Sequence, residues 1–198
     1  MTTHMPATCA PSILVPILPR LARRCEVTSS SSRAWLTPGF GASTAYISLA
    51  PGLVCVFDSD SVQGLTHQSI GAMGLTVHQA WNSAARTLST DLLEGRVTLD
   101  YEPAEDSLGS VVPKGVQVRS SAGYAASWLA HPQLFSTLYS HVDRVLLPYH
   151  ELLFYSRDQQ ELYVFDAPLD DLLRLAKPEH VMRYSVGFPL SCDSRVRS

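Results

Sequence analysis

The clearest hydrophobic pattern in the chain follows Thr76, where apolar residues recur every three or four positions. This spacing places them along one stripe of an α-helix. Thr76 and Gln79 fit a capping box, Leu75 is placed for a hydrophobic staple, and Gly95 ends the pattern. The predicted stripe is Val77, Ala80, Trp81, Ala84, Ala85, Leu88 and Leu92, and the predicted wet face is His78, Asn82 and Arg86.

Apolar runs elsewhere predict β-strands. Residues 43–57 contain two such runs around Pro51-Gly52, which suits the centre of a type II turn, so the segment is predicted as a β-hairpin. A second hairpin is predicted to turn around residues 157–160, where Asp158 fits an Asx-type turn. Further strands are predicted over residues 96–103, 115–120, 144–149 and 181–188, and short helices after Gly64 and Pro168.

A His131-Pro132 step interrupts the helical pattern that begins near Ser120 or Ser121. Proline disfavours helical geometry in the residue before it and suits the first turn of a new helix. Two helices are therefore predicted, with His131 at the end of the first, bonding its last carbonyls. The apolar face of the second is Leu134, Phe135, Leu138, Tyr139 and Val142.

The order of these elements predicts the fold class. Strands come in adjacent groups rather than alternating with helices, which favours an α+β fold with a mixed or mostly antiparallel sheet and about five helices. We expect a single domain over residues 34–190 and a tail over residues 191–198. Residues 1–33 are expected to form a partly flexible N-terminal segment, with a leading strand near residues 13–17 and a serine-rich linker over residues 28–32.

Composition excludes several classes of protein. The 198 residues are 45% hydrophobic and carry a net charge of −3, so there is no basic footprint for nucleic acid. No apolar run is long enough to span a bilayer, and the arginines follow the N-terminal apolar segment rather than precede it, unlike a secretory signal. The four cysteines form no CxxC pair, which favours a reducing compartment. Cys55, inside an apolar run, is predicted to be a small buried residue.

Motifs for catalysis or cofactors are weak. The sequence HELLF at His150 begins like a zinc-protease motif, but Phe154 stands where the second histidine is needed. No nucleotide-binding glycine motif is complete, the other histidines are scattered, and the acidic residues 100–106 lack calcium-loop spacing. We therefore expect no cofactor and no metal, and lean towards a protein that is not an enzyme.

Three short motifs resemble the YtpQ-like family of bacterial proteins of unknown function. They are GLTVHQAWNSAARTL, GYAASWL and LPYHELLFY, in the family's order over roughly residues 45–176. The matching residues are Gly74, Leu75, Thr76, Gly123, Tyr124, Ala126, Ser127, Leu129, Pro148 and Glu151. Where the family pattern has an Asp and an Arg, this chain has Ala125 and Trp128. The resemblance implies a bacterial cytoplasmic α+β domain and carries no activity.

Aromatic residues near predicted element ends indicate a contact surface, because their rings are apolar and their polar tips can bond to water or a partner. The candidate surface is Tyr124, Trp128, Tyr149, His150, Glu151 and Tyr155. The leading hypothesis is a non-enzymatic interaction or regulatory domain that binds another protein. The alternative is a small-ligand-binding protein or hydrolase with a cleft near His150 and Glu151. A buried Trp128 together with a concave pocket lined by His150 and Glu151 would argue against the first hypothesis and for the second. An exposed Trp128 within an apolar patch would argue the reverse.

Overall fold

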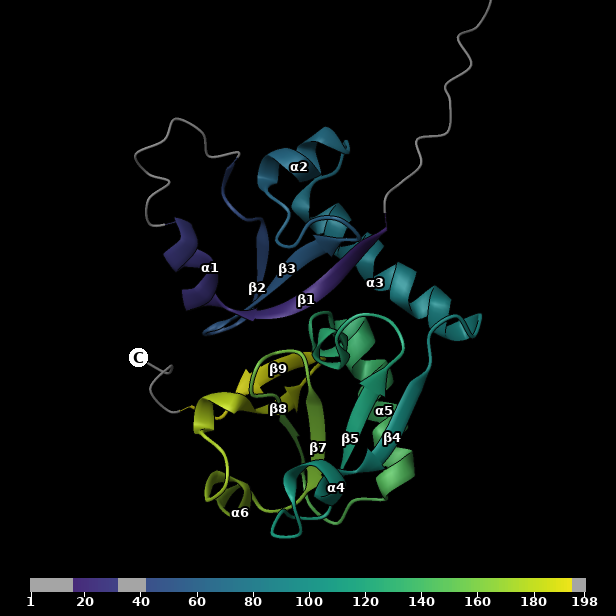
Figure 1. The fold of residues 1–198 in the computed structure, drawn as a ribbon, viewed down its shortest axis with the longest axis vertical. Helices are drawn as coiled ribbons and strands as arrows, with labels where there is room; N and C mark the ends of the chain where they lie inside the picture. The colour runs from purple at the N-terminus through teal and green to yellow at the C-terminus, as the bar shows by residue number, and fades with distance from the viewer. Residues whose placement is uncertain (1–15, 32–41, 194–198) are drawn as a thin grey trace, which may run out of the picture.

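The protein folds into two antiparallel sheets with helices around them (Figure 1). The computed structural model describes residues 16–31 and 42–193, with side chains from residue 28 to residue 31 left undescribed. Buried residues of both sheets belong to one main hydrophobic core, which confirms an α+β fold of one domain.

The smaller sheet has three strands in the order β1-β3-β2. Its strands are β1 (Ile17–Arg23), β2 (Tyr46–Ala50) and β3 (Leu53–Ser59), and α1 (Arg24–Ser31), α2 (His67–Ala72) and α3 (Val77–Leu93) lie beside it. The hairpin between β2 and β3 is confirmed, since Gly52 has a φ of 80°, as the third residue of a type II turn requires.

The N-terminal region differs from the prediction in two respects. The leading strand is β1, further along the chain than residues 13–17, of which residues 13–15 lie outside the described part. The serine-rich stretch predicted as a linker is helical as far as Ser31, in α1. Because β1 pairs along its whole length with β3 and buries Leu21, the folded region begins before residue 34.

The larger sheet has six strands in the order β4-β5-β7-β6-β8-β9. These strands are β4 (Leu99–Pro103), β5 (Gly115–Ser120), β6 (Leu152–Tyr155), β7 (Leu162–Asp166), β8 (Val181–Ser185) and β9 (Phe188–Ser191). The remaining elements are α4 (Ala104–Leu108), α5 (Pro132–Leu146), α6 (Leu169–Leu173) and two 3₁₀ helices, η3 (Ala125–Leu129) and η4 (Pro178–His180). Every strand pair is antiparallel.

Two predicted strands are wrong. Residues 144–149 do not form a strand, because α5 continues to Leu146 and the chain then turns at Leu147 with a φ of 45°. Residues 181–188 are not one strand but the start of a hairpin, which reverses at Val186 and Gly187, both with positive φ. The short helix predicted from Pro168 is confirmed as α6.

Helix α3 follows its predicted pattern. Thr76 accepts a hydrogen bond from the Gln79 amide while the Gln79 side chain accepts one from the Thr76 amide, which is the expected capping box. Ala80, Ala84, Ala85 and Leu88 are buried. His78, Asn82 and Arg86 are exposed, as predicted. The buried stripe packs against β1, which fixes the helix across the smaller sheet.

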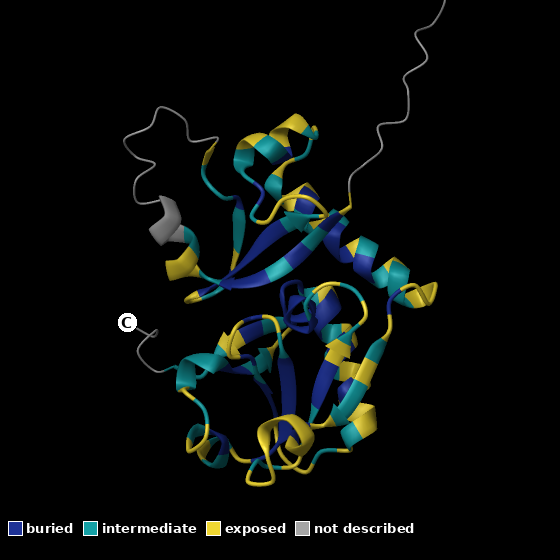
Figure 2. Ribbon diagram, viewed as in Figure 1, coloured by how far each residue is buried: buried dark blue, intermediate teal, exposed yellow. Residues whose placement is uncertain are grey.

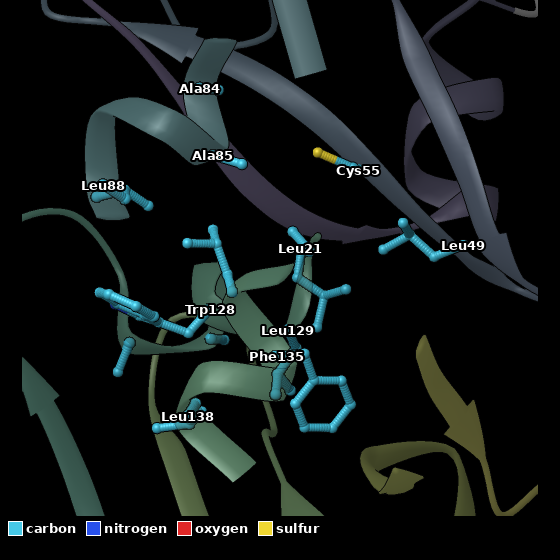
Figure 3. Packing of buried hydrophobic residues seen from close by; sticks show 14 of the residues in the cluster. Leu21, Leu49, Cys55, Ala84, Ala85, Leu88, Trp128, Leu129, Phe135 and Leu138 are labelled. Atoms are coloured by element: carbon cyan, nitrogen blue, oxygen red, sulfur yellow. The ribbon is translucent and has the colours of Figure 1, made fainter. Parts of the chain in front are cut away.

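Alternate residues of the larger sheet enter two different cores. Phe154 and Val164 join the main core. In this core η3 lies between the two sheets and α5 packs on the face of the larger sheet (Figure 2). Leu153 and Phe165 point to the opposite face and join a second, smaller cluster with Leu172 of α6. Figure 3 shows the middle of the main core, where Trp128, Leu129, Phe135 and Leu138 lie below Leu21 of β1.

Candidate ligand-binding site

Trp128 is a core residue, which corrects its predicted place on a contact surface. Its side chain is 0% exposed and packs within the main core (Figure 3). Its Nε1 atom is buried with no hydrogen-bond partner, so the polar tip that favoured a contact role is unused. Ala125 is also buried. Both positions that differ from the YtpQ-like pattern are therefore apolar interior positions here.

His131 caps the helix that follows it rather than the helix that precedes it. Its Nδ1 accepts a hydrogen bond from the Gln133 amide at 3.1 Å, and its Nε2 lies 3.3 Å from Asn82 Oδ1. This pair of contacts requires the neutral ring with its proton on Nε2. Burial lowers the pKa of His131, which favours the same form. Pro132 begins α5 as predicted.

His150 is held by Asp166, at the end of β7. Asp166 Oδ1 accepts hydrogen bonds from the amides of Tyr149 and His150 and lies 3.2 Å from His150 Nδ1. Burial alone would raise the pKa of Asp166, but these hydrogen bonds outweigh it and keep the pKa below its usual value. Glu151 lies 3.4 Å from Arg183 Nε, an ion-pair distance. Neither His150 nor Glu151 lines the cavity beside Tyr124, the groove beside Tyr155 or the pocket beside Lys114, all of which are formed by described residues.

The six residues of the predicted surface are not brought together. Trp128 is in the core, Tyr149 is 91% exposed, and His150 and Glu151 form separate surface contacts. Tyr155 lies on the face of the larger sheet that carries the smaller hydrophobic cluster of Leu153 and Phe165, which we call the second-core face. It lines a small apolar groove there. Tyr124 lines a different and larger cavity at the junction of the two sheets.

This larger cavity has a volume of about 540 Å³, within the usual range of about 300–1,000 Å³ for small-molecule sites. Its walls come from the start of β1, the loop after β3 and the turn that leads into η3. The lining residues are Leu18, Pro19, Asp58, Ser59, Asp60, Ser61, Val62, Gln63, Gly123, Tyr124 and Ser127. We call it the inter-sheet cavity.

The acidic side of the inter-sheet cavity is fixed by Asp58. Its Oδ2 accepts a hydrogen bond from Arg20 Nε at 2.6 Å, and its Oδ1 accepts one from the Gly64 amide at 2.7 Å. The Arg20 guanidinium thus neutralises Asp58 and ties the loop to β1. Asp60, two residues further on, has no cation within ion-pair distance among the described residues.

The opposite side is formed by the turn into η3. Gly123 has a φ of 64°, a conformation that suits glycine, and this turn places Tyr124 beside the loop after β3. Gln63 Nε2 lies 3.5 Å from the Tyr124 hydroxyl. Ser127 is only 4% exposed, and within the described part of the chain its hydroxyl has no hydrogen-bond partner. Ser127 lines the cavity, so its hydroxyl can form a hydrogen bond to a bound molecule.

Sequence reasoning found Tyr124 but missed Asp58, Asp60 and Ser127. The local signal was the polar run DSDSVQ, which directly follows the buried strand LVCVF. Polar residues at the end of a buried strand are well placed to line a site. Their partners lie near residues 18 and 124, and no local pattern links such distant segments.

Other predicted features are structural. Asp158 Oδ1 accepts hydrogen bonds from the amides of Gln160 and Glu161, which confirms the Asx-type turn. Cys55 is buried, and burial raises the pKa of its thiol, so it remains protonated. In the described residues no group of three or more His, Cys, Asp or Glu side chains could hold a metal ion. None of the helices in the same ranges is long and apolar enough to cross a membrane.

Comparisons with known proteins identify no relative of this chain. A scan of protein-family models and searches of curated proteins and of solved structures give no match for this chain. The resemblance to the YtpQ-like family stays a prediction.

Proposed function

We propose that this protein is a binding domain for a small cationic molecule, held in the inter-sheet cavity. The observation that carries the proposal is that one cavity is lined by two polar groups without partners among the described residues. They are the Ser127 hydroxyl, which has no hydrogen bond there, and the Asp60 carboxylate, which has no ion pair there. A hydrogen-bonding group and a negative charge on the walls of one cavity suit a ligand with an amine or ammonium group.

The charge of the cavity supports a cation over an anion. Its lining includes two carboxylates and no lysine, arginine or histidine. Arg20 neutralises Asp58 from behind, so Asp60 remains as the net charge that a ligand would meet. Phosphate and carboxylate ligands would find no cation to pair with, and their desolvation would not be offset.

The apolar part of the cavity supports a ligand with methylene or methyl groups. Leu18 and Pro19 of β1 form this part, and Tyr124 adds an aromatic ring. A cation near the face of an aromatic ring gains about 0.5–2 kcal/mol, depending on its desolvation. No histidine lines the cavity to activate Ser127 as a nucleophile, so we infer binding rather than catalysis.

This proposal keeps the small-ligand alternative from the sequence and moves it away from His150 and Glu151. The interaction hypothesis loses its original basis because Trp128 is buried. Gly123, Tyr124 and Ser127, which carry the middle motif of the YtpQ-like resemblance, all line the cavity. We keep the cytoplasmic location and the family relationship as parts of the same proposal.

Isothermal titration calorimetry with choline and spermidine tests the proposal, with inorganic phosphate as the anionic control. Asp60→Asn is expected to weaken binding of the cations about tenfold, because it removes the net charge of the cavity. The matched control is Asp100→Asn, which removes another exposed carboxylate, on β4, and should change affinity less than about twofold. Equal losses in both variants, or phosphate binding as tightly as the cations, would contradict the proposal.

A further inference from the structure

The second-core face of the larger sheet is only partly covered. Strand alternation places Leu153, Tyr155 and Phe165 on this face, opposite the main core. Its covering helices, α4 and α6, are five residues each, or about 7.5 Å long. Figure 1 shows these two short helices at one end of the sheet, whereas the long helix α5 covers the other face.

A hollow of about 200 Å³ remains between the two short helices. Tyr155 and Phe165 of the sheet line it together with residues of α6 and of the loop after α4. The lining residues are Leu108, Val111, Val112, Tyr155, Phe165, Leu172, Leu175 and Ala176, and we call the hollow the α4–α6 groove. It is smaller than the about 300–1,000 Å³ of small-molecule pockets, so it fits an apolar side chain rather than a whole ligand.

The rim of the groove is apolar and accessible. Leu108 and Leu175 are exposed, and Val111 is 82% exposed. An exposed valine and two leucines around an open apolar hollow form a patch that would lose unfavourable contact with water on binding a partner.

The charges around the groove indicate the chemistry of that partner. Glu105 and Asp106 of α4 and Asp170 of α6 have no ion-pair partner in the described parts of the chain. Of the nearby cations, Arg174 is paired with Asp171 and Lys114 lies 3.9 Å from Asp166, which leaves Lys177 against three unpaired carboxylates. A surface with this excess of carboxylates attracts a basic partner and repels nucleic acid and anionic membranes.

We infer that the α4–α6 groove docks a basic, amphipathic segment of another protein, with one large apolar side chain in the hollow and Lys or Arg against the acidic helices. This surface is separate from the inter-sheet cavity and shares no lining residue with it. The interaction role predicted from the sequence thus moves from Trp128 to a surface where only Tyr155 of the predicted residues takes part.

Fluorescence anisotropy with two labelled twelve-residue peptides tests the inference. The first carries leucines on one helical face and lysines on the other, and the second has glutamate at every lysine position. The variants are Val111→Asp and Leu175→Asp in the groove, with Leu93→Asp as the matched control. Leu93 is an exposed leucine at the end of α3, so its variant adds the same charge at a distant place.

The lysine peptide is expected to bind and the glutamate peptide to bind at least tenfold more weakly. Val111→Asp and Leu175→Asp should each weaken the lysine peptide about tenfold despite their added negative charge, as expected for apolar contacts at the centre of an interface. Leu93→Asp should change affinity less than twofold. Absence of binding, equal affinity in the groove variants, or an equal loss in Leu93→Asp would overturn the inference. Asp60→Asn should leave the peptide's affinity unchanged, so that failure here is distinct from failure of the inter-sheet cavity.

Discussion

At the scale of single residues, the hydrogen bonds of His131 show that this histidine has a structural role. His131 is buried, and both ring nitrogens are occupied by α5 and by Asn82 of α3. The sequence identified its position between two helices but not the helix it serves, because a residue before proline can end one helix or cap the next. The extended backbone of His131, with φ of −147° and ψ of 136°, and the hydrogen bond that its Nδ1 accepts from the Gln133 amide show that it is an N-cap.

Because of His131, the free energy of unfolding is expected to decrease as the pH is lowered. Its pKa when folded lies below its ordinary value of 6.5, so the unfolded chain binds the proton first. The contribution of His131 is complete above about pH 6.5 and is lost as the pH falls through the folded pKa. Urea unfolding between pH 8 and pH 5 should show this decline.

His131→Asn provides the control, since asparagine caps helices but does not titrate in this range. The variant should show a shallower decline than the wild type. His180, whose pKa is lowered by burial and by Arg23, contributes to the slope that remains. The stability that Asp166 contributes is lost only below about pH 4, outside this range. An identical pH dependence in the variant and the wild type would show that His131 does not titrate as described.

At the scale of elements, local patterns succeeded where one period was clear. Helix α3 and both predicted hairpins follow from spacing, caps and turn residues that act within a few positions. Residues 144–147 are mainly apolar in consecutive positions, so they fit a strand or a buried helix end equally well. The packing of α5 against the core, which includes Val142, makes the helical conformation the more stable of the two. The division into two sheets depends on long-range pairing, which no local pattern encodes.

Close contact between strands makes Gly115 a sensitive position. A Cβ atom at this residue of β5 would lie 2.5 Å from Phe165 Cδ1 and 2.6 Å from the Val164 carbonyl oxygen. Gly115→Ala should therefore lower the free energy of unfolding by about 1–3 kcal/mol. Gly71→Ala in α2, where nothing lies within 4 Å, should raise it by up to about 1 kcal/mol. Urea unfolding of both variants checks the pair, and a neutral Gly115→Ala would show that β5 and β7 are less tightly packed than described.

At the scale of the whole molecule, the two sheets create two distinct surfaces. The smaller sheet and the turn into η3 form the inter-sheet cavity, and the partly covered face of the larger sheet forms the α4–α6 groove. Both were beyond the reach of the sequence, because each combines segments that are distant along the chain. Aromatic residues such as Tyr124 and Tyr155 indicated contact surfaces correctly in kind, but the fold places them in separate sites.

The most direct measurement is a ¹H–¹⁵N NMR titration of the full chain with choline. The amides of Gly64, Gly123 and Ser127 should move together and saturably, because these residues form or adjoin the inter-sheet cavity. The amides of Gly109 and Gly187, in other turns of the molecule, should stay in place. Saturable shifts centred on the cavity would establish the site and its ligand class. Shifts centred near His150, or none up to about 10 mM choline, would contradict a cation-binding cavity between the sheets.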